Sequence, residues 1–205
     1  MDLSANDIIG ILDRAGLVAF ALSGVEVGFR RRFDLFGLLV MGVVAATGGG
    51  VMRDVVLNRT PLVLERPDYI AWPVVGSFLA IAFLWRRRQP PRTLLSIAEA
   101  AGLGAFAVAG ALAAIEAELP VTAVILLAIL TATGGGVVRD ILADRVPQVL
   151  LVEVNATAAG LAGLAVWLFE PTSPGVAAIF GVVLAATVRT AGVAFNIHLP
   201  TPHRE

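Results

Sequence analysis

The sequence predicts an all-α integral membrane protein whose seven transmembrane helices form two inverted three-helix repeats followed by a seventh helix. Three observations predict this fold: a high apolar content, long apolar runs separated by charges and prolines, and one internal repeat. Of the 205 residues, 58% are hydrophobic and only 15% are charged. A membrane span needs about 20 residues, so seven spans take roughly 140 and leave no room for a sizeable soluble domain.

Seven apolar segments account for most of the chain. They cover Ile8–Phe29, Leu35–Leu57, Tyr69–Trp85, Thr93–Ile115, Val121–Leu142, Val149–Phe169 and Gly175–Phe195. The first is the weakest because Asp13, Arg14 and Glu26 interrupt it, and the others hold apolar runs of about 16–20 residues. In lipid only helices and closed barrels satisfy their own backbone. The segments lack the polar–apolar alternation of barrel strands, so each is predicted to be a helix.

Arginine sets the predicted orientation, since the chain contains no lysine. Loops on one side of the membrane carry Arg30, Arg31, Arg32, Arg86, Arg87, Arg88, Arg92, Arg145 and, in the tail, Arg204. Loops on the other side carry only Arg59 and Arg66. The positive-inside rule places the arginine-rich side in the cytoplasm. We therefore expect a multi-pass protein with its N-terminus outside and its C-terminus in the cytoplasm.

The chain repeats itself at an offset of 86 residues. Residues 46–64 and 132–150 are identical at 12 of 19 positions, and a block nearer the N-terminus aligns at the same offset. Because the repeated unit has three spans, the second copy enters the membrane from the opposite face, as in transporters whose pathway lies between inverted repeats. The predicted organisation is a first three-helix repeat at 1–85, a second, inverted repeat at 86–171, and a seventh helix with a cytoplasmic tail at 172–205.

The first and fourth segments carry small residues at four-residue spacing. These residues are Ala15, Ala19 and Ser23, and Ala101, Ala105, Ala109 and Ala113. Such stripes let helices pack closely, either within a protomer or between protomers.

The second and fifth segments each contain a threonine followed by three glycines. The candidate lining of an ion pathway consists of Thr47, Gly48, Gly49, Gly50, Thr133, Gly134, Gly135 and Gly136. Each glycine destabilises a helix by about 1 kcal/mol relative to alanine, so a triplet permits a kink or a break. A break frees carbonyl oxygens, which are good ligands for a desolvating alkali cation. Close helix packing is the alternative explanation, but two symmetry-related triplets favour a pathway.

Charged residues inside the spans, or near their ends, are the candidates for gating. They are Arg53, Asp54, Arg139, Asp140 and Arg189. Adjacent residues on a helix point about 100° apart, so Arg53 is not expected to pair with Asp54. We expect the arginines to contact exposed carbonyls or the neighbouring acids Asp13, Glu26, Glu99 and Glu153. An arginine that competes with the ion for carbonyls would make the pathway sensitive to voltage, whereas anchoring at helix ends is the alternative role. For Arg189 the alternative is an ion pair that holds the seventh helix to the bundle.

Other classes of function are not expected. We find no Ser/His/Asp arrangement for nucleophilic catalysis and no paired acids beside a substrate cleft, so the protein is not expected to be an enzyme. The glycine motif lacks the lysine of a phosphate-binding loop. The absence of cysteine excludes disulfides and thiolate metal sites, and a net charge of -1 argues against nucleic-acid binding. No cofactor and no resident metal ion are expected.

Two copies of Thr-Gly-Gly-Gly-x-x-Arg-Asp, 86 residues apart in a seven-span chain, resemble the prokaryotic branch of the TRIC family of trimeric intracellular cation channels. The resemblance covers length, span count, orientation, repeat and motif. It implies a homotrimer in the plasma (inner) membrane, with a separate pore in each protomer. It also implies that the second and fifth helices, kinked at residues 48–50 and 134–136, line the pore. The implied activity is voltage-gated permeation of monovalent cations, K⁺ first and Na⁺ as a second candidate, with membrane lipid as the surrounding partner.

Two alternatives to a channel stay open. Each half of such chains is also catalogued as a glycine transporter domain, so a secondary transporter of a small solute such as glycine is one. An amino-acid carboxylate can be held at a half-helix N-terminus, although the midspan residues are mostly apolar apart from Thr47 and Thr133. A membrane scaffold without flux is the other, and the paired glycine triplets argue against it.

Overall fold

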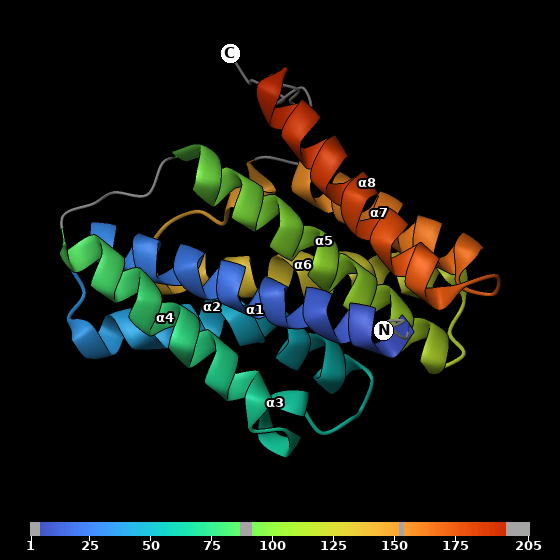
Figure 1. Cartoon of the computed structure of the whole chain (residues 1–205), viewed down its shortest axis with the longest axis horizontal. Helices are drawn as coiled ribbons and strands as arrows, with labels where there is room; N and C mark the ends of the chain where they lie inside the picture. The colour runs from blue at the N-terminus through green and yellow to red at the C-terminus, as the bar shows by residue number, and fades with distance from the viewer. Residues whose placement is uncertain (1–4, 87–91, 152–153, 196–205) are drawn as a thin grey trace, which may run out of the picture.

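The structure, a computed structural model, describes residues 5–86, 92–151 and 154–195, and the regular secondary structure of this part of the chain is all helix (Figure 1). Its longer helices are α1 Ala5–Arg30, α2 Leu35–Val56, α4 Asp68–Trp85, α5 Arg92–Glu116, α6 Val121–Leu142, α7 Val154–Phe169 and α8 Pro174–Ala194. Two short turns join some of them: α3 Leu62–Glu65 follows α2, and the 3₁₀ turn η1 Gln148–Leu150 follows α6.

Six of the helices are long and apolar enough to cross a membrane, and α7 is shorter at 16 residues. The predicted segment Val149–Phe169 therefore needs correction, because its first residues lie in η1 and the helix begins only at Val154. The backbone N–H of Gln148 donates to the Asp140 carboxylate at 2.9 Å, which holds the chain in a turn at this point. The other six segments begin and end within three residues of the predicted bounds.

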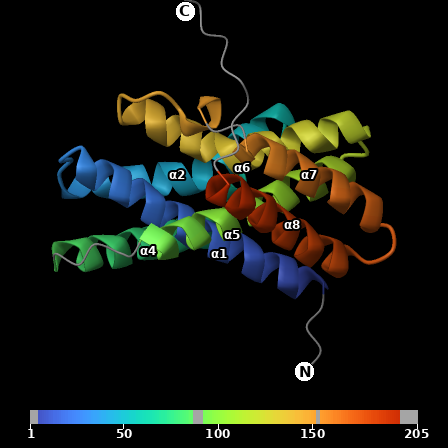
Figure 2. The same ribbon diagram turned by 90° about the horizontal axis from the view of Figure 1, so that it is seen from above.

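The bundle is built around α1 and α5, which pack against each other and against most of the remaining helices. Helix α2 packs on α6, and Figure 2 shows these two helices running in opposite directions. Where α1 meets α5, the rings of Phe20 and Phe106 stack with their centroids 5.0 Å apart. These two residues are 86 positions apart, so the contact joins equivalent positions of the sequence repeat.

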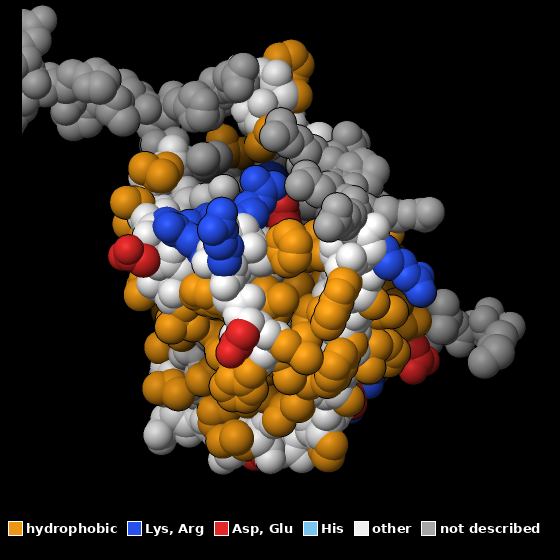
Figure 3. Space-filling view, turned by 90° about the vertical axis from the view of Figure 1, so that its left-hand side faces the viewer, with side chains coloured by type: hydrophobic (Ala, Val, Ile, Leu, Met, Phe, Trp, Pro, Cys, Tyr) orange, Lys and Arg blue, Asp and Glu red, His pale blue; other side chains and the backbone are white. Residues whose placement is uncertain are grey.

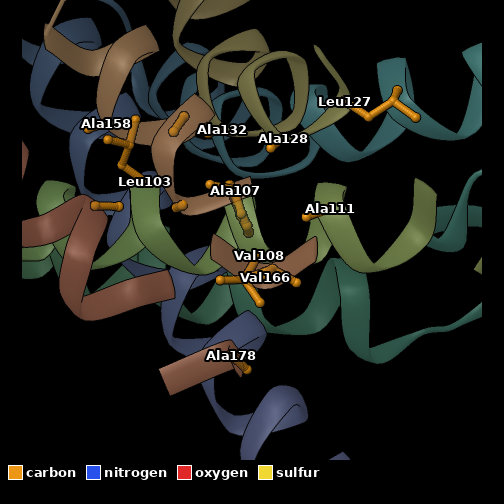
Figure 4. Packing of buried hydrophobic residues seen from close by; sticks show 14 of the residues in the cluster. Leu103, Ala107, Val108, Ala111, Leu127, Ala128, Ala132, Ala158, Val166 and Ala178 are labelled. Atoms are coloured by element: carbon orange, nitrogen blue, oxygen red, sulfur yellow. The ribbon is translucent and has the colours of Figure 1, made fainter. Parts of the chain in front are cut away.

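Small side chains dominate the buried core. Alanines such as Ala107, Ala128 and Ala158 are fully buried between the helices, and valines such as Val108 and Val166 fill the wider gaps (Figure 4). Small residues let helix backbones approach one another, as is typical of packing in membranes. Large apolar side chains point outward instead: Phe78 and Leu126 are 54% and 66% exposed. The lateral surface therefore suits a lipid environment.

The two ends of the bundle carry different charges. Arg30, Arg31, Arg32 and Arg86 are exposed where α1 and α4 end. Figure 3 views this end and shows basic side chains gathered above a broad apolar surface. At the opposite end the exposed Arg59 and Glu116 form an ion pair at 2.8 Å. Charged side chains are thus concentrated beyond the apolar middle of the molecule.

Candidate functional site

The two glycine triplets lie where α2 and α6 cross. A Cβ atom on Gly49 would stand 2.0 Å from the carbonyl oxygen of Thr131, and one on Gly135 would stand 2.1 Å from that of Ala45. The sequence allowed a kink or a break at each triplet, and the structure shows no break, because both helices continue through their triplets. The first two glycines of each triplet instead allow the two backbones to touch, which is the close-packing explanation.

The third glycine of each triplet faces open space. A Cβ atom on Gly50 would meet only the Arg53 guanidinium at 4.0 Å, and one on Gly136 only that of Arg139 at 3.8 Å. Each of these glycines lines a small pocket, together with the threonine three residues before it. The first-repeat pocket, which contains Gly50, has a volume of about 20 Å³. The second-repeat pocket, which contains Gly136, has about 40 Å³.

The linings of the two pockets match at the 86-residue offset of the sequence repeat. The first-repeat pocket is lined by Asp13, Leu17, Ala46, Thr47, Gly50, Val51, Arg53, Asp54, Leu62, Val63 and Tyr69, with Phe106 and Thr131. The second-repeat pocket is lined by Glu99, Leu103, Ala132, Thr133, Gly136, Val137, Arg139, Asp140, Gln148, Val149 and Asn155, with Phe20 and Arg189. The sequence repeat is therefore a repeat of sites, each with one acid from α1 or α5 and one Arg–Asp pair.

The Arg–Asp pair is built in the same way in both pockets. Nε of Arg53 donates to Oδ1 of Asp54 at 2.8 Å, and Nε of Arg139 donates to Oδ1 of Asp140 at 2.9 Å. The expectation that these neighbours do not pair is wrong, because the long arginine side chain reaches round the helix to the adjacent carboxylate. All four side chains are buried. In lipid-facing protein such charges are tolerated when they are paired.

Each of these aspartates also fastens the chain that follows its helix. Oδ2 of Asp54 accepts a hydrogen bond from the backbone N–H of Leu62 at 3.0 Å, the counterpart of the bond between Gln148 and Asp140. Asn58 and Asp144, at equivalent positions, adopt φ angles of 53° and 51°. Asparagine and aspartate adopt this left-handed conformation more readily than most residues. The aspartates thus hold the arginines and the turns α3 and η1 together.

Threonines 47 and 133 are satisfied within their own helices. Oγ1 of Thr47 donates to the carbonyl of Val43 and Oγ1 of Thr133 to that of Ile129, both at 2.8 Å. Both threonines line a pocket. A hydroxyl that donates one hydrogen bond still has lone pairs that can accept a hydrogen bond or contact a cation.

The second-repeat pocket contains a network of charges centred on Glu99. Arg189 of α8 donates from Nη2 to Oε2 of Glu99 at 2.7 Å, which confirms an ion pair for this arginine. Ser23 of α1 donates to Oε1 of Glu99 at 2.6 Å and accepts from Nη1 of Arg139 at 2.6 Å. Arg139 is itself 4.0 Å from Glu99, as expected from the predicted contact with a neighbouring acid. Asn155 Oδ1 and Arg189 Nε are buried without a hydrogen-bond partner in the described part of the chain.

The first-repeat pocket has a simpler set of partners. The hydroxyl of Tyr69 donates to Asp13, the position equivalent to Glu99. A larger cavity of about 890 Å³ lies over this pocket and shares Asp13, Arg53 and Tyr69 with it. Its wider rim carries Arg59, Glu65, Glu116 and Glu170. The second-repeat pocket shares no lining residue with this cavity.

The sequence is similar to a known family and to known membrane proteins. The glycine transporter family has a model that matches residues 10–86 and 96–171. The chain is 44% identical to a UPF0126 membrane protein of Deinococcus radiodurans over 163 residues, which cover 78% of this chain and 75% of that protein. It is 34% identical to the UPF0126 inner membrane protein YadS of Escherichia coli over 195 residues, which cover 93% and 94% of the two chains.

Solved structures decide the family. The chain is similar, with a TM-score of 0.87 and 32% identity, to a structure that explains conductance through TRIC cation channels, over 96% of this chain and 98% of that one. It is also similar to the TRIC orthologue of Rhodobacter sphaeroides, with a TM-score of 0.84 and 31% identity over 93% and 99% of the two chains. The chain belongs to the TRIC family. It is a multi-pass membrane protein, and its structural relatives are cation channels rather than enzymes.

The acids predicted from the sequence as partners of the buried arginines do not all lie near them in this TRIC-family chain. Glu99 reaches Arg139 and Arg189, whereas Asp13 lines the pocket of Arg53 and is bonded to Tyr69. Glu26 lies at the end of α1 and pairs with Arg30, four residues later, at 2.5 Å. Glu153 lies outside the described residues.

The sequence did not predict the roles of Tyr69 and Asn155, which line the pockets, or of Ser23, which bonds to Glu99 and Arg139. The repeat contained a signal for two of them, because Tyr69 and Asn155 occupy equivalent polar positions at the 86-residue offset. Asp13 and Glu99 are related in the same way. Ser23 has no such signal, since only the packing of α1 against α5 and α6 brings it to the network.

Proposed function

We propose that this protein is a channel for monovalent cations, permeable to K⁺, with a pathway inside each protomer at the crossing of α2 and α6. The observation that carries the proposal is the pair of matched polar pockets beside that crossing, in a chain whose structural relatives are cation channels. Both pockets offer carboxylates and threonine oxygens, which are ligands suited to a hard cation.

The proposed pathway runs from one pocket to the other past the glycines. Arg53 and Arg139 each lie four residues after a contacting glycine, so each pocket extends about 6 Å from the crossing by helical rise. Because α2 and α6 are antiparallel (Figure 2), the pockets extend toward opposite ends of the bundle. Two repeats in inverted orientation would produce this arrangement, and we propose that relation for 1–85 and 86–171, with 172–205 as the added helix and tail.

The conformation described is closed at the crossing in this proposal. The backbones of the two triplets are in contact at Gly49 and Gly135, which leaves no room for an ion between them. Opening would require α2 and α6 to move apart by bending at the triplets, where glycine offers the least resistance. In the open state α2 and α6 would then be kinked at the triplets and would line the pore.

We propose that voltage acts on the buried arginines. Moving one elementary charge through the full membrane field changes its energy by about 2.3 kcal/mol per 100 mV. Arg53 and Arg139 lie close to the crossing and are held mainly by the adjacent aspartates. A shift of these side chains toward the glycines would occupy the pathway, and a shift away would clear it.

The proposed setting is a homotrimer in the plasma membrane, surrounded by lipid. Membership of the TRIC family supports the trimer. The name of the Escherichia coli relative, an inner membrane protein, supports the plasma membrane. The exposed arginines at the end where α1 and α4 finish favour a cytoplasmic position for that end. The N-terminus would then be outside and the C-terminus cytoplasmic. K⁺ is the proposed permeant ion and Na⁺ the second candidate.

One observation favours the alternative of a secondary transporter for a small solute such as glycine, namely the description of the matching family. The pocket volumes of about 20 and 40 Å³ argue for the channel. A water molecule occupies about 10–15 Å³ by this measure, so the first-repeat pocket holds about one or two waters and the second-repeat pocket about three. Each therefore fits an ion better than an amino acid.

Purified protein in planar bilayers under a K⁺ gradient tests the proposal. We expect unitary currents that reverse near the K⁺ equilibrium potential. Glycine uptake into liposomes without unitary currents would instead establish the transporter and refute the channel.

A matched pair of variants on α6 ties the current to the pocket. Gly136→Leu places a side chain in the second-repeat pocket without a backbone clash and should reduce the unitary current at least severalfold. Leu126→Ala, on the exposed face of the same helix, should leave it unchanged. Equal effects of the two variants would show that current does not pass through this pocket.

A further inference from the structure

The seventh helix makes the two matched pockets unlike each other. Helix α8 packs against α5 and contributes Arg189 to the second-repeat pocket (Figure 1). The side chain of Arg189 is only 11% exposed and is bonded to Glu99. The first-repeat pocket has no such addition among the described residues, whose lining side chains come from the two repeats alone. The second-repeat pocket therefore contains one guanidinium group that has no counterpart in the described lining of the first.

The formal charges of the pockets differ as a consequence. In the first-repeat pocket Asp13 and Asp54 face Arg53, which leaves two carboxylates against one guanidinium. In the second-repeat pocket two carboxylates face two guanidinium groups, those of Arg139 and Arg189. Counted over the described lining residues, the formal charge is thus -1 in the first pocket and zero in the second.

A second difference adds to the first. Nε of Arg145 stands 3.0 Å from Oδ1 of Asp140 and brings a further positive charge behind the second-repeat pocket. The equivalent Arg59 turns away and pairs with Glu116 at 2.8 Å. The large cavity over the first-repeat pocket also carries acids on its rim, including Glu65 and Glu170. The electrostatic asymmetry therefore extends from the pockets to the ends of the pathway.

We infer that Arg189 makes the unitary current rectify: cations enter more readily from the first-repeat end than from the second-repeat end. This inference rests on the proposed function. A negative pocket concentrates cations at its mouth, whereas a neutral pocket backed by positive charge depletes them. With equal K⁺ on both sides, current that starts at the first-repeat end is the larger. Arg189 sets the difference because its neutralisation would return the second pocket to the net negative charge of the first.

The hydrogen bonds around Glu99 make the Arg189–Glu99 pair suitable for a test by substitution. Ser23 still donates to Glu99 at 2.6 Å when Arg189 is replaced, and Arg139 remains 4.0 Å away. The Glu99 carboxylate therefore keeps a hydrogen-bond donor and a nearby positive charge when Arg189 is replaced. The competing explanation is that the Arg189–Glu99 pair only holds α8 to the bundle, which predicts lower stability and an unchanged shape of the current–voltage curve.

Unitary currents in planar bilayers with equal K⁺ on both sides decide between these explanations. In the wild-type channel we expect larger amplitudes at the polarity that drives K⁺ from the first-repeat end. Arg189→Gln should raise the smaller amplitude by about two- to tenfold, as expected for loss of one charge near the path, and bring the ratio close to one. Arg189→Lys keeps the charge and should keep the wild-type ratio. Glu99→Gln removes the opposing charge and should move the ratio further from one.

The outcomes separate the inference from the function on which it rests. A wild-type protein without unitary current refutes the channel itself. A wild-type channel whose amplitude ratio is the same in Arg189→Gln overturns the inference alone, even where the melting temperature of that variant falls. If Arg189→Gln does not fold, Glu99→Gln decides: a ratio further from one supports the inference, and an unchanged ratio overturns it.

Discussion

Replacing Gly49 with alanine should destabilise the protein, whereas the same replacement at the next residue, Gly50, should not. The added Cβ atom at Gly49 would stand 2.0 Å from the carbonyl oxygen of Thr131, and contacts under 3.0 Å essentially never occur. Helices α2 and α6 would have to separate by about 1 Å, because a backbone carbonyl cannot rotate away as a side chain can. At Gly50 the added atom meets only a flexible guanidinium at 4.0 Å.

The size of the effect follows from two opposing terms. Overpacking of a well-packed interior costs about 1–3 kcal/mol, and a rigid backbone contact belongs at the upper end of that range. Alanine in place of glycine inside a helix gains about 1 kcal/mol. The net expectation is a loss of about 2 kcal/mol for Gly49→Ala and a gain of up to about 1 kcal/mol for Gly50→Ala. For a chain of this size 1 kcal/mol shifts the melting temperature by about 2–4 °C.

Thermal unfolding in detergent, followed by circular dichroism, measures both variants under the same conditions. Gly49→Ala should melt about 4–8 °C below the wild type, and Gly50→Ala at or slightly above it. Gly135→Ala and Gly136→Ala repeat the comparison in the second repeat, with the same order expected. Equal melting temperatures within either pair, or a reversed order, would refute the assignment of the first glycines to contact and the third to a pocket.

Three further predictions concern the charges. Asp140→Asn should lower the free energy of unfolding by about 3–5 kcal/mol, because a buried ion pair is broken and the backbone N–H of Gln148 loses its carboxylate acceptor. Chemical unfolding in detergent measures this free energy, and a loss under about 1 kcal/mol would contradict the prediction. Glu116→Gln removes the partner of the exposed Arg59 and should change the free energy of unfolding by less than about 1 kcal/mol in the same assay. A larger loss would show that this exposed ion pair stabilises the fold. Arg53→Gln should change the voltage at which the channel is half open, measured from open probability in planar bilayers, and an unchanged voltage dependence would rule this arginine out as a sensor.

The main elements of the fold could be predicted from the sequence because span length and apolar runs are linear properties of the chain. The exception, α7, shows where that reasoning ends: Val149 is apolar, yet it lies in a turn that the buried Asp140 holds from the preceding helix. A hydrogen bond between segments eight residues apart cannot be seen in hydropathy. Residues of both matched motifs line the two pockets.

The geometry of the site could not be predicted to the same depth. The glycine triplets allowed a kink or a break in their helices, because glycine is a weak helix former in isolation. In the folded protein the contact between α2 and α6 stabilises both helices and uses the missing side chains. Arg53 and Asp54 were likewise expected to point apart, but a flexible arginine and the end of a helix bring them together.

By itself the sequence determined the order of the apolar segments, the 86-residue repeat and the family to which the motifs point. Hydrophobic length and internal identity depend only on the order of residues, so no coordinates are needed to read them. Only the tertiary structure decided which glycine of each triplet touches a neighbouring helix, which lines a pocket, and that Arg189 meets Glu99. These facts depend on how each helix is rotated about its axis and where it crosses its neighbours, and side chains from distant segments set both through packing.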